Sequence, residues 1–139
     1  MAKEKNTTTS ANYSATIAET NLELSARDKI KFKDTQNAVS LLDFATDAKN
    51  NDAKAIVENI QGYVVLDIHN EKSDDIDYKN YLIIDGNGDK YVTGSNSFFN
   101  AFMAIFTEMK DEKEPWSIEL NLLPSKNYKG KEILTCSLV

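Results

Sequence analysis

Residues 124–131, with the sequence PSKNYKGK, combine three kinds of chemistry in one short loop. Lys126, Lys129 and Lys131 supply positive charge for phosphates, Tyr128 supplies a ring on which a base can stack, and Gly130 gives the backbone freedom. Stacking needs an unpaired base with an exposed face and contributes about 1–3 kcal/mol per base. The loop therefore favours a single-stranded nucleic acid. The competing interpretation is a solvated hairpin tip that happens to be rich in lysine.

A second group of tyrosines and lysines lies on the strands expected in the middle of the chain. Side chains two residues apart share one face of a strand, so Lys79 and Tyr81 lie together as a phosphate contact and a stacking ring would. The alternative is that these tyrosines cover the core and keep only their hydroxyls at the surface. The candidate DNA-binding residues of this group are Tyr63, Lys79, Tyr81, Lys90 and Tyr91.

The sequence offers little for catalysis. His69 and Cys136 are each the only residue of their type, and no nucleophile has a nearby histidine to act as its base. Cys136 falls in an alternating strand at a position for a small buried hydrophobic residue. We therefore expect a protein that is not an enzyme and that uses no cofactor and no metal. Asp67 and His69 keep a metal-dependent nuclease as a third hypothesis, although acidic loops are usually only hydrated.

Charge and composition limit the kind of partner. The formal net charge of −6 argues against a protein that binds nucleic acid by electrostatic attraction alone. Fifteen of the sixteen basic residues are lysines, and Arg27 is the exception. Bidentate arginine dominates sequence readout in DNA grooves, whereas lysine acts as a point charge on phosphates. Nucleic-acid binding by this chain would have little sequence preference.

The chain of 139 residues is long enough for one domain with a substantial core. No apolar run is long enough to span a bilayer, so no membrane association is expected. The N-terminus has no apolar segment of the kind found in a secretory signal. A single cysteine cannot form an internal disulfide, which fits a reducing compartment. These features predict a cytoplasmic protein.

The N-terminal part is expected to lie outside the main domain. Residues 1–24 are predicted to form a flexible arm, because they contain few large apolar side chains. Residues 25–53 are predicted to form a short basic strand at 29–33, followed by a helix capped by Asp34 or Thr35. We expect the arm to dock on a neighbouring subunit and to support self-association through Tyr13, Ile17, Leu22 and Leu24.

Residues 54–139 show the pattern strand, strand, strand, helix, strand, strand. The strands are expected at 60–68, 78–84, 89–93, 116–122 and 131–138, with a bulge at Gly62. The helix is expected to run from a cap among residues 95–97 to about residue 110, and Phe99 lies off its apolar face and is expected to meet another subunit. This order, mainly β with helices, is that of the five-stranded OB-type barrel, although other α+β folds share it. The residues predicted for the apolar face are Phe98, Phe102, Ile105, Phe106 and Met109.

Two stretches resemble small single-stranded DNA-binding proteins of phages, and related OB-fold proteins of conjugative plasmids from Gram-positive bacteria. They are KYVTGSNSFFNAFMAIFTEM and the closing LNLLPSKNYKGKEILTCSLV. The resemblance covers about residues 54–139 and implies cooperative coating of single-stranded DNA during replication or transfer in a bacterial host. It implies that the loop lysines and Tyr128 contact the strand and that Tyr81 and Tyr91 stack on bases. The chain lacks the acidic tail ending in phenylalanine of typical bacterial members of this group.

A hypothesis from a different class is an acidic protein-interaction factor, encoded by a phage or plasmid, that inhibits a host protein. The net charge and the aspartate-rich stretch at residues 67–89 favour it, because an acidic surface can engage a basic site on a partner. The lysine- and tyrosine-containing loop favours DNA instead.

Overall fold

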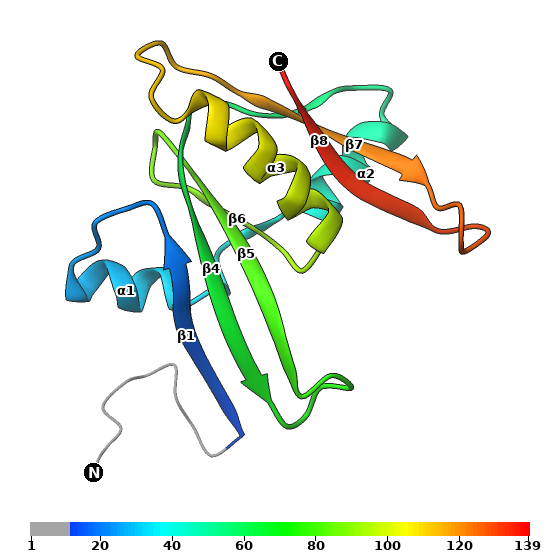
Figure 1. Ribbon diagram of the computed structural model, residues 1–139. Coiled ribbons are helices and arrows are strands. Elements are labelled where there is room, and N and C mark those ends of the chain that lie inside the picture. Colours follow the sequence, from blue (N-terminus) through cyan, green and yellow to red (C-terminus); the bar gives the residue numbers. More distant parts are fainter. Residues whose placement is uncertain (1–11) are drawn as a thin grey trace.

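The computed structural model describes residues 12–139 (Figure 1). The described chain has a mixed α/β fold that consists mostly of strands. The elements are β1 (Tyr13–Thr20), α1 (Ala26–Lys33), β2 (Val39–Ser40), α2 (Leu41–Asn50), β3 (Ala55–Val57), β4 (Ile60–Asn70), β5 (Asp77–Asp85), β6 (Lys90–Thr93), α3 (Asn96–Met109), β7 (Ile118–Pro124) and β8 (Glu132–Leu138).

The strands form two sheets, and one bent segment links them. The larger sheet has the order β1-β4-β5-β6-β2, and the smaller has the order β3-β7-β8. β3 and β4 are separated by two residues, of which Asn59 has a φ of 55°, so the chain turns sharply from one sheet into the other. The backbone N–H of Ile60 donates to the carbonyl of Trp116 at 2.9 Å at this bend. Within the described residues the sheets do not close into a barrel.

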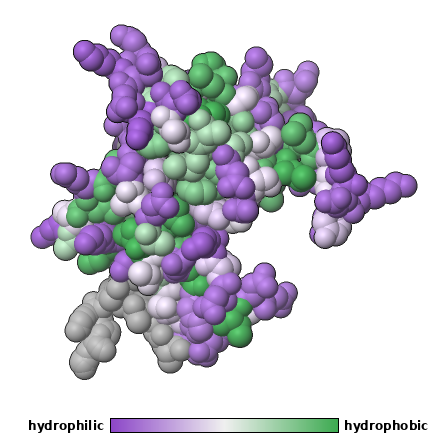
Figure 2. Space-filling model, in the orientation of Figure 1, coloured by the Kyte–Doolittle hydropathy of each residue, from purple (hydrophilic) through white to green (hydrophobic). Residues whose placement is uncertain are grey.

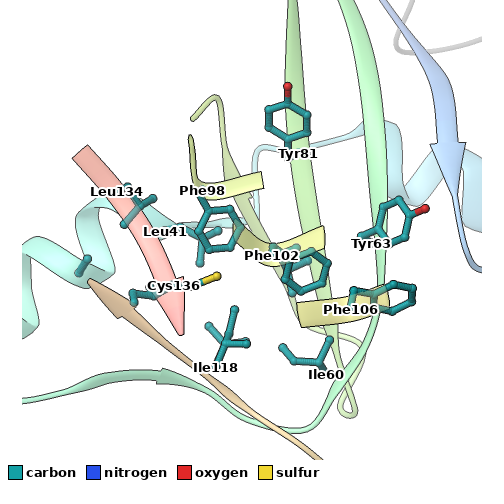
Figure 3. Packing of buried hydrophobic residues seen from close by; sticks show 14 of the residues in the cluster. Leu41, Ile60, Tyr63, Tyr81, Phe98, Phe102, Phe106, Ile118, Leu134 and Cys136 are labelled. Atoms are coloured by element: carbon teal, nitrogen blue, oxygen red, sulfur yellow. The ribbon is translucent and has the colours of Figure 1, made fainter. Parts of the chain in front are cut away.

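The half of the β4–β5 hairpin formed by residues 62–66 and 81–85 is buried on both faces, which explains its nearly continuous apolar sequence. One face packs under α3, where Tyr63, Val65 and Ile83 meet Phe98 and Phe102 (Figure 3). The opposite face forms a second cluster beneath α1 and β1. Full burial of one large apolar side chain stabilises the fold by about 1.5–3 kcal/mol. The buried members of the second cluster are Ala15, Phe32, Val64, Leu66, Ile68, Leu82 and Ile84.

The elements from residue 60 onward follow the predicted order, whereas the short strand β3 (Ala55–Val57) before them was not predicted. Gly62 lies at a register shift between β4 and β5, which confirms the predicted bulge. Ser95 caps α3, since its hydroxyl accepts a hydrogen bond from the backbone N–H of Phe98 at 3.1 Å. Phe99 was expected to reach another subunit. That expectation is corrected, because its ring stacks on Tyr81 of the same chain with 4.3 Å between centroids.

The prediction of a strand at residues 29–33 is wrong, because these residues belong to helix α1. Ser25 and Asp28 form a reciprocal capping box: the Ser25 hydroxyl accepts from the Asp28 N–H, and an Asp28 carboxylate oxygen accepts from the Ser25 N–H. The alternation of lysine and apolar residues suggested a strand, but only Phe32 of this helix is buried. Ile30 is exposed.

Helix α2 begins later than predicted. Ser40, rather than Asp34 or Thr35, is its N-cap, and the Ser40 hydroxyl accepts from the N–H of Asp43 at 3.2 Å. Val39 and Ser40, which directly precede the helix, form β2, and β2 runs parallel to β6. Pairing with the sheet edge therefore delays the start of the helix.

The described part of the N-terminal segment is an integral strand, and the expected flexible arm is corrected for residues 13–20. β1 pairs with β4 in antiparallel register, from Tyr13 opposite Asn70 to Thr20 opposite Val64. Without β1, the edge of β4 would expose a row of unpaired backbone groups. The four expected docking residues, Tyr13, Ile17, Leu22 and Leu24, pack on the second apolar cluster of their own chain. Residues 1–11 lie outside the described residues.

We predict that Gly62→Ala lowers the free energy of unfolding by about 1–3 kcal/mol, because it overpacks a close contact. A Cβ at residue 62 would lie 2.5 Å from Oδ1 of Asn21 and 2.8 Å from Leu22. It would also disturb the 2.8 Å hydrogen bond from the Tyr63 N–H to Asn21. Urea unfolding measures this change in the free energy of unfolding. Gly94→Ala is the matched control, since its Cβ meets nothing closer than 3.7 Å. Equal stability of both variants would contradict this packing.

Candidate nucleic-acid interface

The loop between β7 and β8 is held by its own hydrogen bonds. The N–H of Ser125 donates to the carbonyl of Lys131 at 2.9 Å, and the N–H of Lys131 donates to the carbonyl of Tyr128 at 3.1 Å. The Ser125 hydroxyl accepts from the N–H groups of Asn127 and Tyr128. Gly130 has a φ of 83°, in the left-handed region where glycine is tolerated without strain. The loop therefore has a defined shape and presents its side chains at the end of a two-stranded arm (Figure 1).

Tyr128 is the most exposed tyrosine candidate of the sequence. Its side chain is 65% exposed, and the ammonium of Lys131 lies 5.8 Å from its ring centroid. Lys126 and Lys129 are also exposed. A cation beside an open aromatic face suits a base stacked on the ring with its phosphate near a lysine. The structure thus brings together all four residues that the sequence predicted for this loop.

An apolar patch adjoins the loop on the outward face of the hairpin. Leu123 and Ile133 lie opposite each other in the β7–β8 register, and both are exposed. Figure 2 shows apolar surface next to the hydrophilic arm that projects on the right. We did not predict these two residues, although they alternate with the partly buried Leu122 and the buried Leu134 and could have been assigned to the outer face.

Tyr63 and Tyr81 do not belong to this surface. Both are only 6% exposed and point into the cluster under α3 (Figure 3). Burial, followed by the 2.7 Å hydrogen bond to Glu19, raises the pKa of Tyr63 to about 12. The Tyr81 hydroxyl donates to Asn96 at 3.2 Å, and its ring is covered by Phe99. Neither ring has an open face for a base, so these residues are part of the core.

Tyr91 is also used within the fold. Its ring stacks on Phe44 with 6.5 Å between centroids, and its hydroxyl donates to the buried Asp85 at 3.0 Å. Burial and this hydrogen bond raise the pKa of Tyr91 to about 12. The same Asp85 carboxylate accepts the N–H groups of Asn87 and Asp89 and so stabilises the β5–β6 turn. Tyr91 therefore braces that turn.

Lys79 and Lys90, the two candidate lysines of the middle strands, lie outside the β7–β8 loop and have partners within the fold. Lys79 pairs with Asp67 across β4 and β5. The ammonium of Lys90 donates to the carbonyls of Lys31 and Asp34 at 2.9 and 2.6 Å, and so caps the end of α1. Of the nine DNA-binding candidates, the structure gathers four on the β7–β8 loop and assigns the other five to structural contacts.

The β4–β5 hairpin ends in a surface of opposite charge. Asp74, Asp75 and Asp77 are exposed there. His69 Nδ1 lies 2.7 Å from a carboxylate oxygen of Asp77, and its Nε2 lies 3.2 Å from one of Glu71; the protonated ring donates to both. Within residues 12–139, no group of three or more histidine, cysteine, aspartate or glutamate side chains is arranged to hold a metal ion. The carboxylate of Asp67 is occupied by Lys79.

Comparison of the chain with protein-family models, with curated proteins and with solved structures found no match. Among the helices of residues 12–139, none has the length and apolarity needed to cross a bilayer. The functional assignment therefore rests on the chemistry and geometry of the chain's own residues.

We predict that His69 titrates above its usual pKa of 6.5, because hydrogen bonds to Asp77 and then Glu71 favour its charged form. Its contribution to stability is then present below pH 6.5 and is lost as the pH rises through the folded-state pKa. Asp77→Asn should lower this pKa, whereas Asp75→Asn is the matched control. As the only histidine, His69 gives a single imidazole signal in an NMR titration. A pKa at or below 6.5 in the unmodified protein would contradict the arrangement.

Proposed function

We propose that this chain is a non-enzymatic protein that binds single-stranded DNA with little sequence preference, in replication or conjugative transfer. The observation that supports the proposal most directly is the exposed Tyr128, which has Lys131 over its ring and shares an ordered loop with Lys126 and Lys129. An open aromatic face takes any base, and lysine ammonium groups take any phosphate. Duplex DNA offers phosphates but no free base faces, so the loop favours single strands.

The arrangement of the strands is compatible with an open OB-type barrel. In that fold the first strand bends and pairs on both sides, as β3 and β4 do with β7 and β5. α3 lies between the third and fourth strands of this set and packs against β8. OB folds bind oligonucleotides with the loop that joins their last two strands. The β7–β8 loop occupies that position in the order of elements.

The overall negative charge does not conflict with this proposal, since the charges are separated in space. The aspartates lie on the β4–β5 hairpin, whereas three lysines lie on the β7–β8 hairpin, which projects in another direction (Figure 1). Three phosphate contacts predict a slope of about −2 when the logarithm of the association constant is plotted against the logarithm of salt concentration. Because this slope is small, stacking would contribute a large share of the binding free energy.

Titration of a fluorescent oligo-dT, with a matched duplex for comparison, tests the proposal. Tyr128→Ala should weaken binding by about 5- to 140-fold, which corresponds to the loss of one stacked base. Tyr128→Phe keeps the ring and should bind almost as the unmodified protein does. Ile76→Ala removes an exposed apolar side chain from the other hairpin and serves as the control. Lack of oligo-dT binding at low salt, or unchanged binding by Tyr128→Ala, would refute the proposal.

The second candidate function is an acidic factor that binds and inhibits a host protein. The exposed aspartates at the end of β4–β5 favour it, because they are suited to a basic site on a partner. Asp74→Asn combined with Asp75→Asn separates the two functions. A partner-binding factor loses binding in this variant, whereas the affinity for oligo-dT stays equal or rises as repulsion falls.

A further inference from the structure

Helix α1 carries a concentration of positive charge that the fold does not require. Four of its eight residues are basic, namely Arg27, Lys29, Lys31 and Lys33, and Asp28 is its only acid. Phe32 alone is buried, and the helix is attached to the sheet through that side chain. The remaining surface of α1 faces solvent with its cations.

These cations are retained at a cost to the helix. Arg27 and Lys31 are four residues apart, as are Lys29 and Lys33, and like charges at this spacing destabilise a helix by a few tenths of a kcal/mol. Within residues 12–139, no salt bridge involves any of the four. The carbonyls at the C-terminal end of α1 are already capped by Lys90. Lys31 and Lys33 stand in the last turn of α1, where positive charge complements the helix dipole, but no ion pair within the described residues neutralises either charge.

A groove of about 740 Å³ runs beside these two lysines. It lies between α1, the segment at residues 34–37 and the turn from β5 to β6. Lys31 and Lys33 line one side, and Tyr13, Gln36 and Asn37 provide an aromatic ring and amides. Asp34 and Asp89 also line the groove; one oxygen of Asp34 already accepts the N–H of Gln36 at 3.0 Å. The flank formed by α1 is thus the side suited to an anion.

The position of α1 relates this groove to nucleic-acid binding. In OB folds, the outer face of the second and third strands helps to bind oligonucleotides. The corresponding face here is that of β5 and β6, and Phe32 of α1 packs on the cluster containing Leu82 and Ile84 on that side. With this face covered, the exposed flank of α1 and the adjoining groove are the nearest surface that a nucleic acid can reach.

We propose that the groove beside α1 binds the phosphodiester backbone of single-stranded DNA, with Lys31 and Lys33 as its phosphate contacts. This inference rests on the proposed function and adds a second, electrostatic contact surface to the stacking loop. The two surfaces lie on opposite sides of the molecule (Figure 1). A strand that reaches both must follow the protein surface, so the α1 surface contributes to binding of long strands.

The test measures the affinity for a long oligo-dT as a function of salt concentration. Lys31→Gln combined with Lys33→Gln removes two phosphate contacts, so the binding is weaker at low salt and the salt slope is smaller by about 1.4. The control, Lys72→Gln combined with Lys113→Gln, changes the net charge equally, and neither residue lies on α1 or lines the groove. Lys31→Arg combined with Lys33→Arg keeps both charges and restores the slope, which separates charge loss from damage to the helix.

The outcomes distinguish the two proposals. A slope and affinity unchanged in the Lys31/Lys33 glutamine variant would overturn the groove as a binding surface, while dependence on Tyr128 would leave single-stranded DNA binding intact. An equal loss in the control pair would also overturn it, because the effect would then come from net charge alone. Failure of the unmodified protein to bind oligo-dT would overturn both proposals.

Discussion

The burial of the β4–β5 hairpin on both faces is the constraint on which the rest of the structure depends. Five consecutive residues of β5, from Tyr81 to Asp85, are buried, so neither face of this part of the sheet can meet water. α3 and the smaller sheet cover one face, and α1, with Leu22 and Leu24 of the segment before it, covers the other. Residues 13–33 are therefore packed into the same core as residues 54–139.

This constraint also decides where a ligand can bind. The three tyrosines predicted to stack on bases from this sheet are used within the fold, since Tyr63 and Tyr81 are buried beneath α3 and Tyr91 braces a turn. Side chains that must be exposed to contact a ligand therefore lie away from the centre of this sheet. Tyr128 and its lysines stand on one hairpin, Asp74, Asp75 and Asp77 stand on the other, and a second group of cations lies on α1. The separation allows a chain of net charge −6 to present cationic surfaces.

The sequence predicted the parts of this fold that local patterns determine. The bulge at Gly62, the Ser95 cap and the β7–β8 loop depend on residues that are close together in the chain, and all are present. The sequence did not reveal which face of each strand would be covered by distant segments. The alternation of Tyr81 with Lys79 is compatible both with an exposed strand and with a half-buried one, so it does not show whether that face is covered. We predicted a strand from the alternation at residues 29–33. The capping box of Ser25 and Asp28 is the local signal that indicates the helix instead.

The most direct test is an NMR map of backbone amide shifts in the labelled protein during titration with unlabelled oligo-dT. The account predicts the largest changes at residues 125–131, with further changes at residues 31–33, and little change at Tyr63 and Tyr81 in the core. Changes concentrated at residues 71–77 of the acidic hairpin, or none at residues 125–131 at saturating oligo-dT, would contradict it.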